Sequence, residues 1–151
     1  MLHSPTLHRR LSSWSRRFCA LILLLAFDVE NQTNLSSVLS TLKSTNTPAT
    51  FFVLGNIAER FPQIVPSIRT GGHELANHTY SHNYLTTMSH SEIVADLQRA
   101  QRLLEQQAGG KISSYFRPPY GSYNSASLAA IGAAGFSHAV LWDVDPRDWS
   151  G

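Results

Sequence analysis

Short apolar segments that alternate with helical segments limit the fold of this chain more than any other feature. We expect strands at residues 19–27, 49–54, 73–77, 114–117 and 137–144, each bounded by a turn or by a helix. Amphipathic spacing predicts helices between them, and the clearest begins at the capping box Ser89-x-x-Glu92. Strands alternating with helices form a parallel sheet with right-handed crossovers, either open or rolled into a barrel. The sequence therefore predicts an α/β fold.

The start of the chain is basic and carries most of the net charge. The net charge is +2, and four arginines, Arg9, Arg10, Arg16 and Arg17, lie before residue 19. The remainder is close to neutral, which argues against nucleic acid as a partner. The 42% apolar and 15% charged residues are ordinary for a globular domain. A single cysteine, Cys19, excludes an intrachain disulfide and a thiolate metal site.

Residues 1–18 and residues 19–151 are expected to be separate units. The first is a leader that we expect to be disordered or a remnant of a targeting signal, because a basic region before an apolar run is how a secretory signal begins. The apolar run at residues 19–27 has no small-x-small cleavage site after it and is too short to span a bilayer. It fits better as a buried parallel strand that presents Asp28 at its C-terminal end.

Two histidines, His78 and His82, are the strongest candidates for a binding site. They are four residues apart, and on a helical turn this spacing places both imidazoles on one face, close enough to share a cation. Two neutral imidazoles suit a borderline ion such as Zn²⁺, and a catalytic site adds a carboxylate and keeps a position open. Histidines at this spacing also occur as plain surface residues of a helix. The nearby Asp28 and the segment Arg-Pro-Pro-Tyr-Gly at residues 117–121 favour a metal site.

The order of these motifs resembles the polysaccharide deacetylase family, the NodB homology domain of carbohydrate esterase family 4. The resemblance is carried by residues 26–30, 73–82, 116–121 and 145–149. It implies an α/β fold of the distorted (β/α) barrel type found in polysaccharide deacetylases. Because the family's last motif, with the histidine that acts as general acid, would lie beyond Trp149, we expect the barrel to be C-terminally incomplete. The resemblance implies a metal-dependent hydrolase that removes N-acetyl groups from a polysaccharide such as chitin or peptidoglycan.

The family resemblance implies a metal-ligand set that departs from the usual pattern at one position. His78 and His82 would bind a divalent metal, most simply zinc, and Asp28 matches the catalytic base. Val29 stands where the family has its ligand aspartate, so Glu30 is the candidate third ligand. The alternative is that Glu30 is a solvated loop carboxylate, which is common after a strand.

The remaining site residues also follow from the resemblance. Arg117 would pair with Asp28 and orient it, and the backbone N–H of Tyr120 would donate to the oxyanion, with Tyr120 also lining the substrate site. Asp145 or Asp148 would hold Arg117, and Trp149 would line the sugar groove. The alternative for residues 116–121 is a tight surface turn in which Arg117 is exposed and has no catalytic role. We expect Trp142 to pack in the core.

Two other functions remain open alongside deacetylation of a glycan. One is a catalytically impaired carbohydrate-binding remnant, and the other is a related amide hydrolase that acts on a small molecule. The expected partner is an N-acetylated glycan, without nucleic acid and without an integral membrane span, and the expected state is a monomer. An extracellular or cell-wall location follows from such a substrate. His90, at a helix start, and His138, which opens a buried strand, are expected to be structural.

Overall fold

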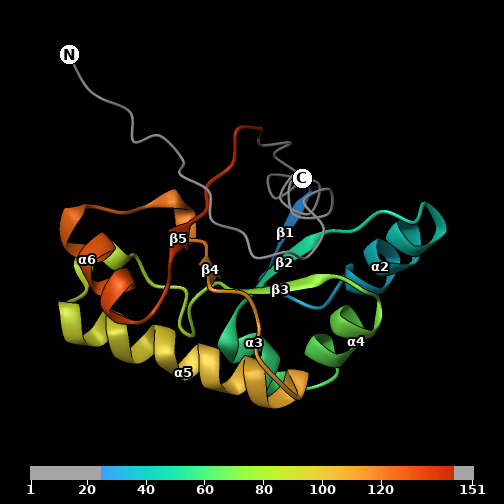
Figure 1. Cartoon of the computed structure of the whole chain (residues 1–151), viewed down its shortest axis with the longest axis horizontal. Helices are drawn as coiled ribbons and strands as arrows, with labels where there is room; N and C mark the ends of the chain where they lie inside the picture. The colour runs from blue at the N-terminus through green and yellow to red at the C-terminus, as the bar shows by residue number, and fades with distance from the viewer. Residues whose placement is uncertain (1–24, 145–151) are drawn as a thin grey trace, which may run out of the picture.

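The structure, a computed structural model, describes residues 25–144 and contains one parallel sheet covered by helices (Figure 1). The strands are β1 (Ala26–Val29), β2 (Thr50–Val53), β3 (Glu74–Asn77), β4 (Tyr115–Phe116) and β5 (His138–Ala139). The helices are α2 (Leu35–Ser44), α3 (Gly55–Arg60), α4 (Ile64–Thr70), α5 (His90–Ala108) and α6 (Ser125–Ala133). Two 3-10 turns, η1 (Leu85–Thr87) and η2 (Pro119–Gly121), complete the described part. The α/β fold expected from the sequence is confirmed.

The strands lie in the sheet in the order in which they occur along the chain. Each pairs in parallel with the next, giving the order β1-β2-β3-β4-β5. The register aligns Val29 with Val53, Val53 with Asn77, and Asn77 with Phe116. Chain segments that leave β1, β3 and β4 therefore start from one edge of the sheet, the edge where α/β folds place functional groups.

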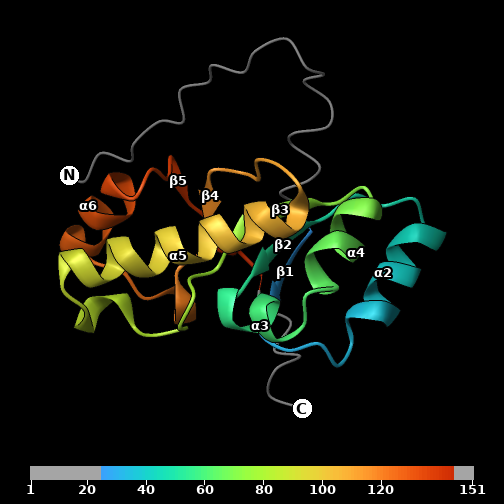
Figure 2. The ribbon, with the colours of Figure 1, turned by 90° about the horizontal axis from the view of Figure 1, so that it is seen from below.

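The core consists of two apolar clusters. One lies around β1 to β3 and is centred on Phe51, Val53 and Ile68, each at most 1% exposed. The other lies around β4, η1, α5 and α6 and includes Leu97 and Phe116. Helix α5 runs beneath the sheet from α6 to α3 and α4, and contacts all three helices (Figures 1 and 2). Full burial of each such side chain contributes roughly 1.5–3 kcal/mol.

Helix α5 begins and ends where the sequence predicts. The Ser89 hydroxyl accepts from the N–H of Glu92 at 3.3 Å, and the Glu92 carboxylate accepts from the N–H of Ser89 at 2.7 Å. This reciprocal pair satisfies two of the donors that every helix start leaves free. The helix ends at Gly109, whose φ of 67° is left-handed and therefore favours glycine.

Several predicted strands are shorter than expected. The segment expected as a strand over residues 137–144 forms only His138–Ala139, and both residues are exposed. The prediction that His138 lies on a buried strand is wrong for this reason, as is the core position of Trp142, which is 42% exposed. The strand expected over residues 19–27 is described only from residue 25 and appears as Ala26–Val29, which includes Asp28. The leader and Cys19 lie outside the described residues.

Within residues 25–144, no helix is long and apolar enough to cross a membrane.

Candidate metal centre

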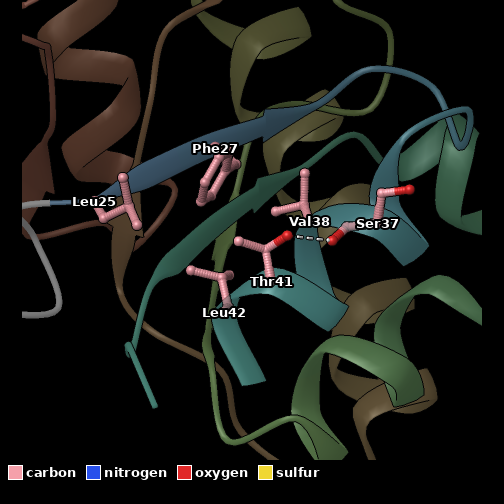
Figure 3. Close-up of a pocket in the computed structure, with 6 residues that line it drawn as sticks. All are labelled: Leu25, Phe27, Ser37, Val38, Thr41 and Leu42. Atoms are coloured by element: carbon pink, nitrogen blue, oxygen red, sulfur yellow. Dashed lines mark hydrogen bonds between the residues drawn. The ribbon is translucent and has the colours of Figure 1, made fainter. Parts of the chain in front are cut away.

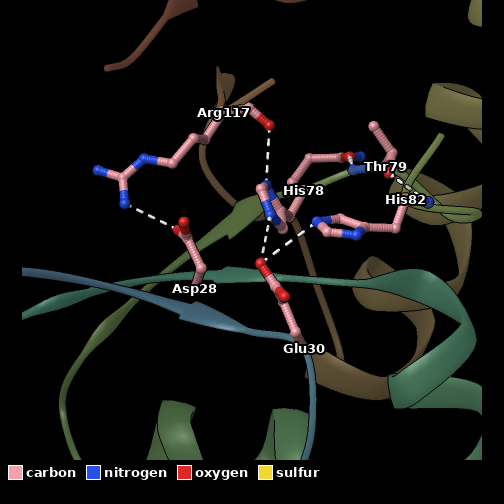
Figure 4. A network of polar contacts seen from close by, with 7 residues as sticks. Asp28, Glu30, His78, Thr79, His82 and Arg117 are labelled. Carbon is pink, nitrogen blue, oxygen red and sulfur yellow. Dashed lines mark hydrogen bonds and ion pairs between the residues drawn. The ribbon is translucent and has the colours of Figure 1, made fainter. Parts of the chain in front are cut away.

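Three strands of the sheet, β1, β3 and β4, are each followed directly by an ionisable side chain at the same edge. Glu30 follows β1, His78 follows β3 and Arg117 follows β4. Their strands are in register through Val29, Asn77 and the residues between them in the sheet. Figure 4 shows Asp28, Glu30, His78, His82 and Arg117 meeting at this edge. The topology of the sheet thus assembles residues that are far apart in the sequence.

Glu30, His78 and His82 form a three-residue group with ligand atoms within 4.8 Å of one another. A Glu30 carboxylate oxygen lies 3.5 Å from Nε2 of His78 and 3.2 Å from Nε2 of His82. The His78 side chain is 1% exposed and that of Glu30 is 47% exposed, so the group has a buried side and an open side. Two imidazoles and one carboxylate with an open side are the arrangement of a catalytic zinc site.

The hydrogen bonds of His78 leave the inward nitrogen free to act as a ligand. Its Nδ1 lies 2.9 Å from the carbonyl oxygen of Arg117, which can only accept, so Nδ1 carries the proton. The lone pair is then on Nε2, on the side of Glu30. The Nε2 atoms of His78 and His82 are both buried, and neither makes a hydrogen bond to any residue from 25 to 144. Two buried imidazole nitrogens that converge on a carboxylate fit a metal cation.

The segment that carries both histidines is a loop, so the prediction of a helical turn is wrong. Strand β3 ends at Asn77, and Thr79 and His82 have positive φ angles of 72° and 61°. Left-handed backbone is rare for a β-branched residue such as Thr79. The histidines still converge, with ring centroids 5.1 Å apart, because the loop folds back on itself. Thr79 Oγ1 accepts from the N–H of His82 at 3.0 Å, which closes this fold.

Neighbouring elements hold the loop in this strained conformation. The Asp96 carboxylate on α5 accepts from the N–H of Tyr80 at 2.7 Å and more weakly from that of Ser81 at 3.4 Å. On the other side, the first N–H groups of α3 donate to the loop, Gly55 to the Thr79 carbonyl at 2.9 Å and Asn56 to the Tyr80 carbonyl at 3.2 Å. The loop is therefore clamped between the N-terminus of α3 and the middle of α5.

Buried Asn77 provides a third support for the same loop. Its side-chain oxygen accepts from the N–H of Thr79 at 2.8 Å. Its amide nitrogen donates to the carbonyl of Leu97 at 3.1 Å and to Gln101 at 3.2 Å, both on α5. The Asn77 amide thus connects the end of β3 to α5 and satisfies polar groups that would be costly to bury alone.

Arg117 and Asp28 form the ion pair that the family resemblance implies. Nη1 of Arg117 donates to Oδ1 of Asp28 at 2.7 Å, and the two side chains are 6% and 27% exposed. The guanidinium also lies over the ring of Phe52, 4.2 Å from its centroid. Because the carbonyl of the same residue accepts from Nδ1 of His78, Arg117 contacts both Asp28 and a histidine of the group. The two residues expected to hold Arg117 from the other side, Asp145 and Asp148, lie outside the described residues, as does Trp149.

The electrostatics of the group favour an ionised Glu30 and a neutral His82. Contact with the His78 side chain, opposed by burial and aided by the charge of His82, lowers the pKa of Glu30 below its ordinary value. Burial lowers the pKa of His82, with Glu30 opposing the shift. At neutral pH this corresponds to an ionised carboxylate and a neutral His82, the protonation states that a metal ion requires.

The turn after β4 places Tyr120 over His82. Tyr120 is left-handed, with φ 58°, and its backbone N–H has no acceptor among residues 25–144. Its ring lies 4.7 Å from the ring of His82 and stacks on Tyr84 at 4.1 Å. Gly121 follows with φ 63°, and a Cβ there would lie 3.0 Å from the Trp142 indole. The turn is thus closely packed on both sides.

The hollow between β1 and α2 is a separate feature (Figure 3). It has a volume of about 340 Å³ and is lined by Leu25, Phe27, Ser37, Val38, Thr41 and Leu42. Its polar groups are already satisfied in part, since the Thr41 hydroxyl donates to the Ser37 carbonyl at 3.0 Å. None of these side chains is ionisable, so the hollow does not compete with the Glu30, His78 and His82 group as a catalytic site.

Sequence reasoning missed two residues that shape the site. Asp96 lies beside the apolar face of α5, next to the buried residue Leu97. A carboxylate beside a buried face usually has a specific hydrogen-bond partner, and this position is the signal that could have identified Asp96. Tyr84 lies two residues after His82 and is 50% exposed, and only its stacking on Tyr120 distinguishes it from an ordinary surface residue.

Comparison with known proteins finds polysaccharide deacetylases both by family model and by individual relatives. The sequence model of a family described as polysaccharide deacetylase matches residues 18–139. A peptidoglycan-N-acetylglucosamine deacetylase of Bacillus cereus is 39% identical over 114 residues, which are 76% of this chain and 41% of that protein. A chitooligosaccharide deacetylase of Azorhizobium caulinodans is 34% identical over 113 residues, covering 75% of this chain and 53% of that protein.

A solved structure has the same fold. It is a pseudoenzyme of carbohydrate esterase family 4 from Bacillus anthracis, with a TM-score of 0.78 and 29% identity, covering 83% of this chain and 44% of that one. The chain thus spans about half the length of the curated relatives it matches. Similarity thus extends both to proteins named as deacetylases and to one named as a pseudoenzyme.

Proposed function

Because this chain belongs to the polysaccharide deacetylase family, we propose that it is a metal-dependent hydrolase that removes N-acetyl groups from a glycan such as chitin or peptidoglycan. The observation that carries the proposal is the convergence of Glu30, His78 and His82 beside the Asp28–Arg117 pair. Two relatives named for deacetylation of N-acetylglucosamine polymers support the substrate class.

Glu30 takes the place of the missing ligand aspartate because of strand geometry. Side chains alternate along a strand, so Asp28 and Val29 project to opposite faces of β1, and Glu30, the first residue after the strand, is exposed like Asp28. Val29 is 4% exposed and packs in the core with Phe51. An aspartate at position 29 would therefore be buried among apolar groups here, whereas Glu30 reaches both histidines from the open face. The spacing Asp-x-Glu is thus consistent with a complete ligand set.

The residues present fit a divalent metal, and zinc is the simplest choice for this donor set. Two unpartnered Nε2 atoms and a carboxylate with a lowered pKa are its ordinary ligands. When bound, the ion polarises the acetamide carbonyl and lowers the pKa of water. Glu30, His78 and His82 would hold it.

The other residues supply proton transfer and charge stabilisation. Asp28, held by Arg117, takes a proton from the attacking water as the water oxygen bonds to the carbonyl carbon. The free N–H of Tyr120 donates to the oxygen that becomes negative. The carbon–nitrogen bond then breaks, acetate leaves, and the amine takes up a proton, which Asp28 can return. One water and one acetamide thus give one amine and one acetic acid, which ionises to acetate by releasing a proton to solvent.

Further assignments belong to the same proposal. Asp145 or Asp148 holds Arg117, whose Nε is buried and without a partner among residues 25–144. Trp149 lines the sugar groove, and the domain comprises residues 19–151. A glycan of this type places the protein outside the cell or at the cell wall, acting as a monomer.

The decisive experiment is a titration of zinc into metal-free protein, with the heat of binding measured by calorimetry. Wild type is compared with Glu30→Gln, with a His78→Ala/His82→Ala double variant and with Glu92→Gln, a carboxylate that bonds to Ser89 at the start of α5. Tight binding that the first two variants lose and Glu92→Gln retains supports the ligand set. Absence of binding by the folded wild type would refute it.

Acetate release then separates the enzyme from the other candidates. Zinc-loaded protein is incubated with chitopentaose, and acetate is measured with wild type and Asp28→Asn. Release by wild type alone supports deacetylation. Glycan binding without acetate would favour the carbohydrate-binding remnant, to which the similarity to a pseudoenzyme points. Hydrolysis of a small amide, with none of the glycan, would favour the small-molecule hydrolase.

A further inference from the structure

Three aromatic rings form a column that leads from the metal site to the surface. The rings of His82 and Tyr120 are 4.7 Å apart, and those of Tyr120 and Tyr84 are 4.1 Å apart and nearly parallel, at 15°. Tyr84 and Tyr120 are 50% and 54% exposed. Large exposed aromatic rings beside a catalytic site are unusual on a surface without a binding role.

The outermost ring is held rigidly. Tyr84 lies directly before η1, and its carbonyl accepts both from the N–H of Thr87 at 3.1 Å and from the Thr87 hydroxyl at 2.8 Å. Leu85, the next residue, is 1% exposed and anchors the segment in the second core cluster. The Thr86 hydroxyl lies 3.3 Å from that of Ser122, which connects η1 to the turn that carries Tyr120. A ring that is both exposed and fixed loses little entropy when a ligand packs on it.

We propose that Tyr84 is a stacking platform for a sugar unit that lies beyond the immediate neighbour of the one that is deacetylated, and that it makes the protein prefer longer oligosaccharides. The inference rests on the proposed glycan substrate. The ring of Tyr120 contacts both that of His82 and that of Tyr84, so the exposed ring of Tyr84 extends this series of contacts from the metal site.

The chemistry of the ligand follows from that of the ring. The faces of pyranose rings carry C–H groups that pack on an aromatic face, and the phenol hydroxyl can hydrogen-bond to sugar hydroxyls. A chain of sugars whose reacting acetamide lies at Glu30 and His82 extends along the column as far as Tyr84. A substrate of one or two units would end before this platform, so Tyr84 acts on chain length and not on the reaction itself.

The test measures binding of N-acetylglucosamine oligomers from the dimer to the pentamer by calorimetry. Wild type is compared with Tyr84→Ala, Tyr84→Phe and Tyr123→Ala, an exposed tyrosine outside the column. We expect Tyr84→Ala to weaken binding of the pentamer about tenfold and to leave the dimer unchanged. Tyr84→Phe keeps the ring and should retain most of the affinity, and Tyr123→Ala should behave as wild type.

The alternatives give different patterns. A loss in Tyr84→Ala that is equal at all lengths would mean that Tyr84 only supports Tyr120, and would overturn the platform. Affinity of wild type that does not rise with length, or no binding at all, would overturn it as well. If the length dependence is present but no acetate is released, the platform stands and the proposed hydrolase fails, so the two proposals are tested separately.

Discussion

Removal of the Asp96 carboxylate should weaken metal binding through the backbone of the loop, although Asp96 does not belong to the ligand group. The carboxylate is the partner of the Tyr80 and Ser81 N–H groups, which lie between His78 and His82. In Asp96→Ala both N–H groups lose their acceptor, and the left-handed angles of Thr79 and His82 lose a restraint. We expect the loop to relax and the imidazoles to separate.

The structure sets the size of the effect. A hydrogen bond to a charged acceptor contributes about 1.5–3 kcal/mol, and the 2.7 Å bond from Tyr80 supplies most of it, since 3.4 Å for Ser81 is near the limit. We therefore expect Asp96→Ala to lose about 2 kcal/mol of unfolding free energy. Loss of an outer support typically weakens metal affinity by about 10-fold to 100-fold, and we expect the lower end because Asn77 and α3 still hold the loop.

The assay pairs zinc calorimetry with urea unfolding of the metal-free protein, and Glu92→Gln is the control. Glu92 lies on the same helix, one turn before Asp96, but its partner is Ser89 and not the loop. We expect Glu92→Gln to lose stability with wild-type zinc affinity, and Asp96→Asn to lie between wild type and Asp96→Ala. Equal zinc affinity in Asp96→Ala and Glu92→Gln would refute the argument that Asp96 holds the loop.

Three further predictions follow from the packing and charges of the described residues. Arg117→Met should lower the unfolding free energy by about 3 kcal/mol and stop acetate release, because Asp28 loses its partner; unchanged urea unfolding would contradict the pairing. Gly55→Ala should cost about 1–3 kcal/mol, since the new Cβ would lie 2.7 Å from the Tyr80 ring and 3.2 Å from the Ala100 backbone. In the control Gly132→Ala the new Cβ has no atom within 4 Å, so this variant should raise the unfolding free energy by about 0.5–1 kcal/mol. Equal changes in the unfolding free energy of Gly55→Ala and Gly132→Ala, measured in urea, would show that packing at Gly55 is not the cause. Burial lowers the pKa of His73 below its ordinary 6.5. Below pH 6.5 the unfolded chain therefore binds a proton that the folded chain does not, and the free energy of unfolding falls as pH decreases. Urea unfolding at about pH 7.5 and about pH 5.5 should show a smaller fall in unfolding free energy for His73→Gln than for wild type.

Local patterns were sufficient for the parts of the fold that depend on neighbours in the sequence. The start of α5 was predictable from Ser89 and Glu92 because a capping box involves residues three apart. The parallel sheet followed from alternation, because apolar periodicity reports which face of each segment is buried. The family was predictable too, since its motifs recur in order along the chain, and the match over residues 18–139 confirms it.

Other expectations failed where a local pattern met a long-range contact. His78 and His82 have helical spacing, but Asn77, Asp96 and α3 impose a loop with left-handed residues. Trp142 is large and apolar, but it packs on Gly121 at the surface and remains 42% exposed. Neither outcome depends on sequence neighbours, so neither could be predicted from spacing.

By itself the sequence determined the class of fold, the two histidines and the candidate base Asp28, because periodicity and motif order are properties of the chain. Only the tertiary structure decided that Glu30 meets both histidines, that Arg117 reaches Asp28, and that Tyr84 extends the column beyond Tyr120. The physical reason is the register of parallel strands, which brings residues 30, 78 and 117 to one edge of the sheet and makes neighbours of groups that the sequence separates.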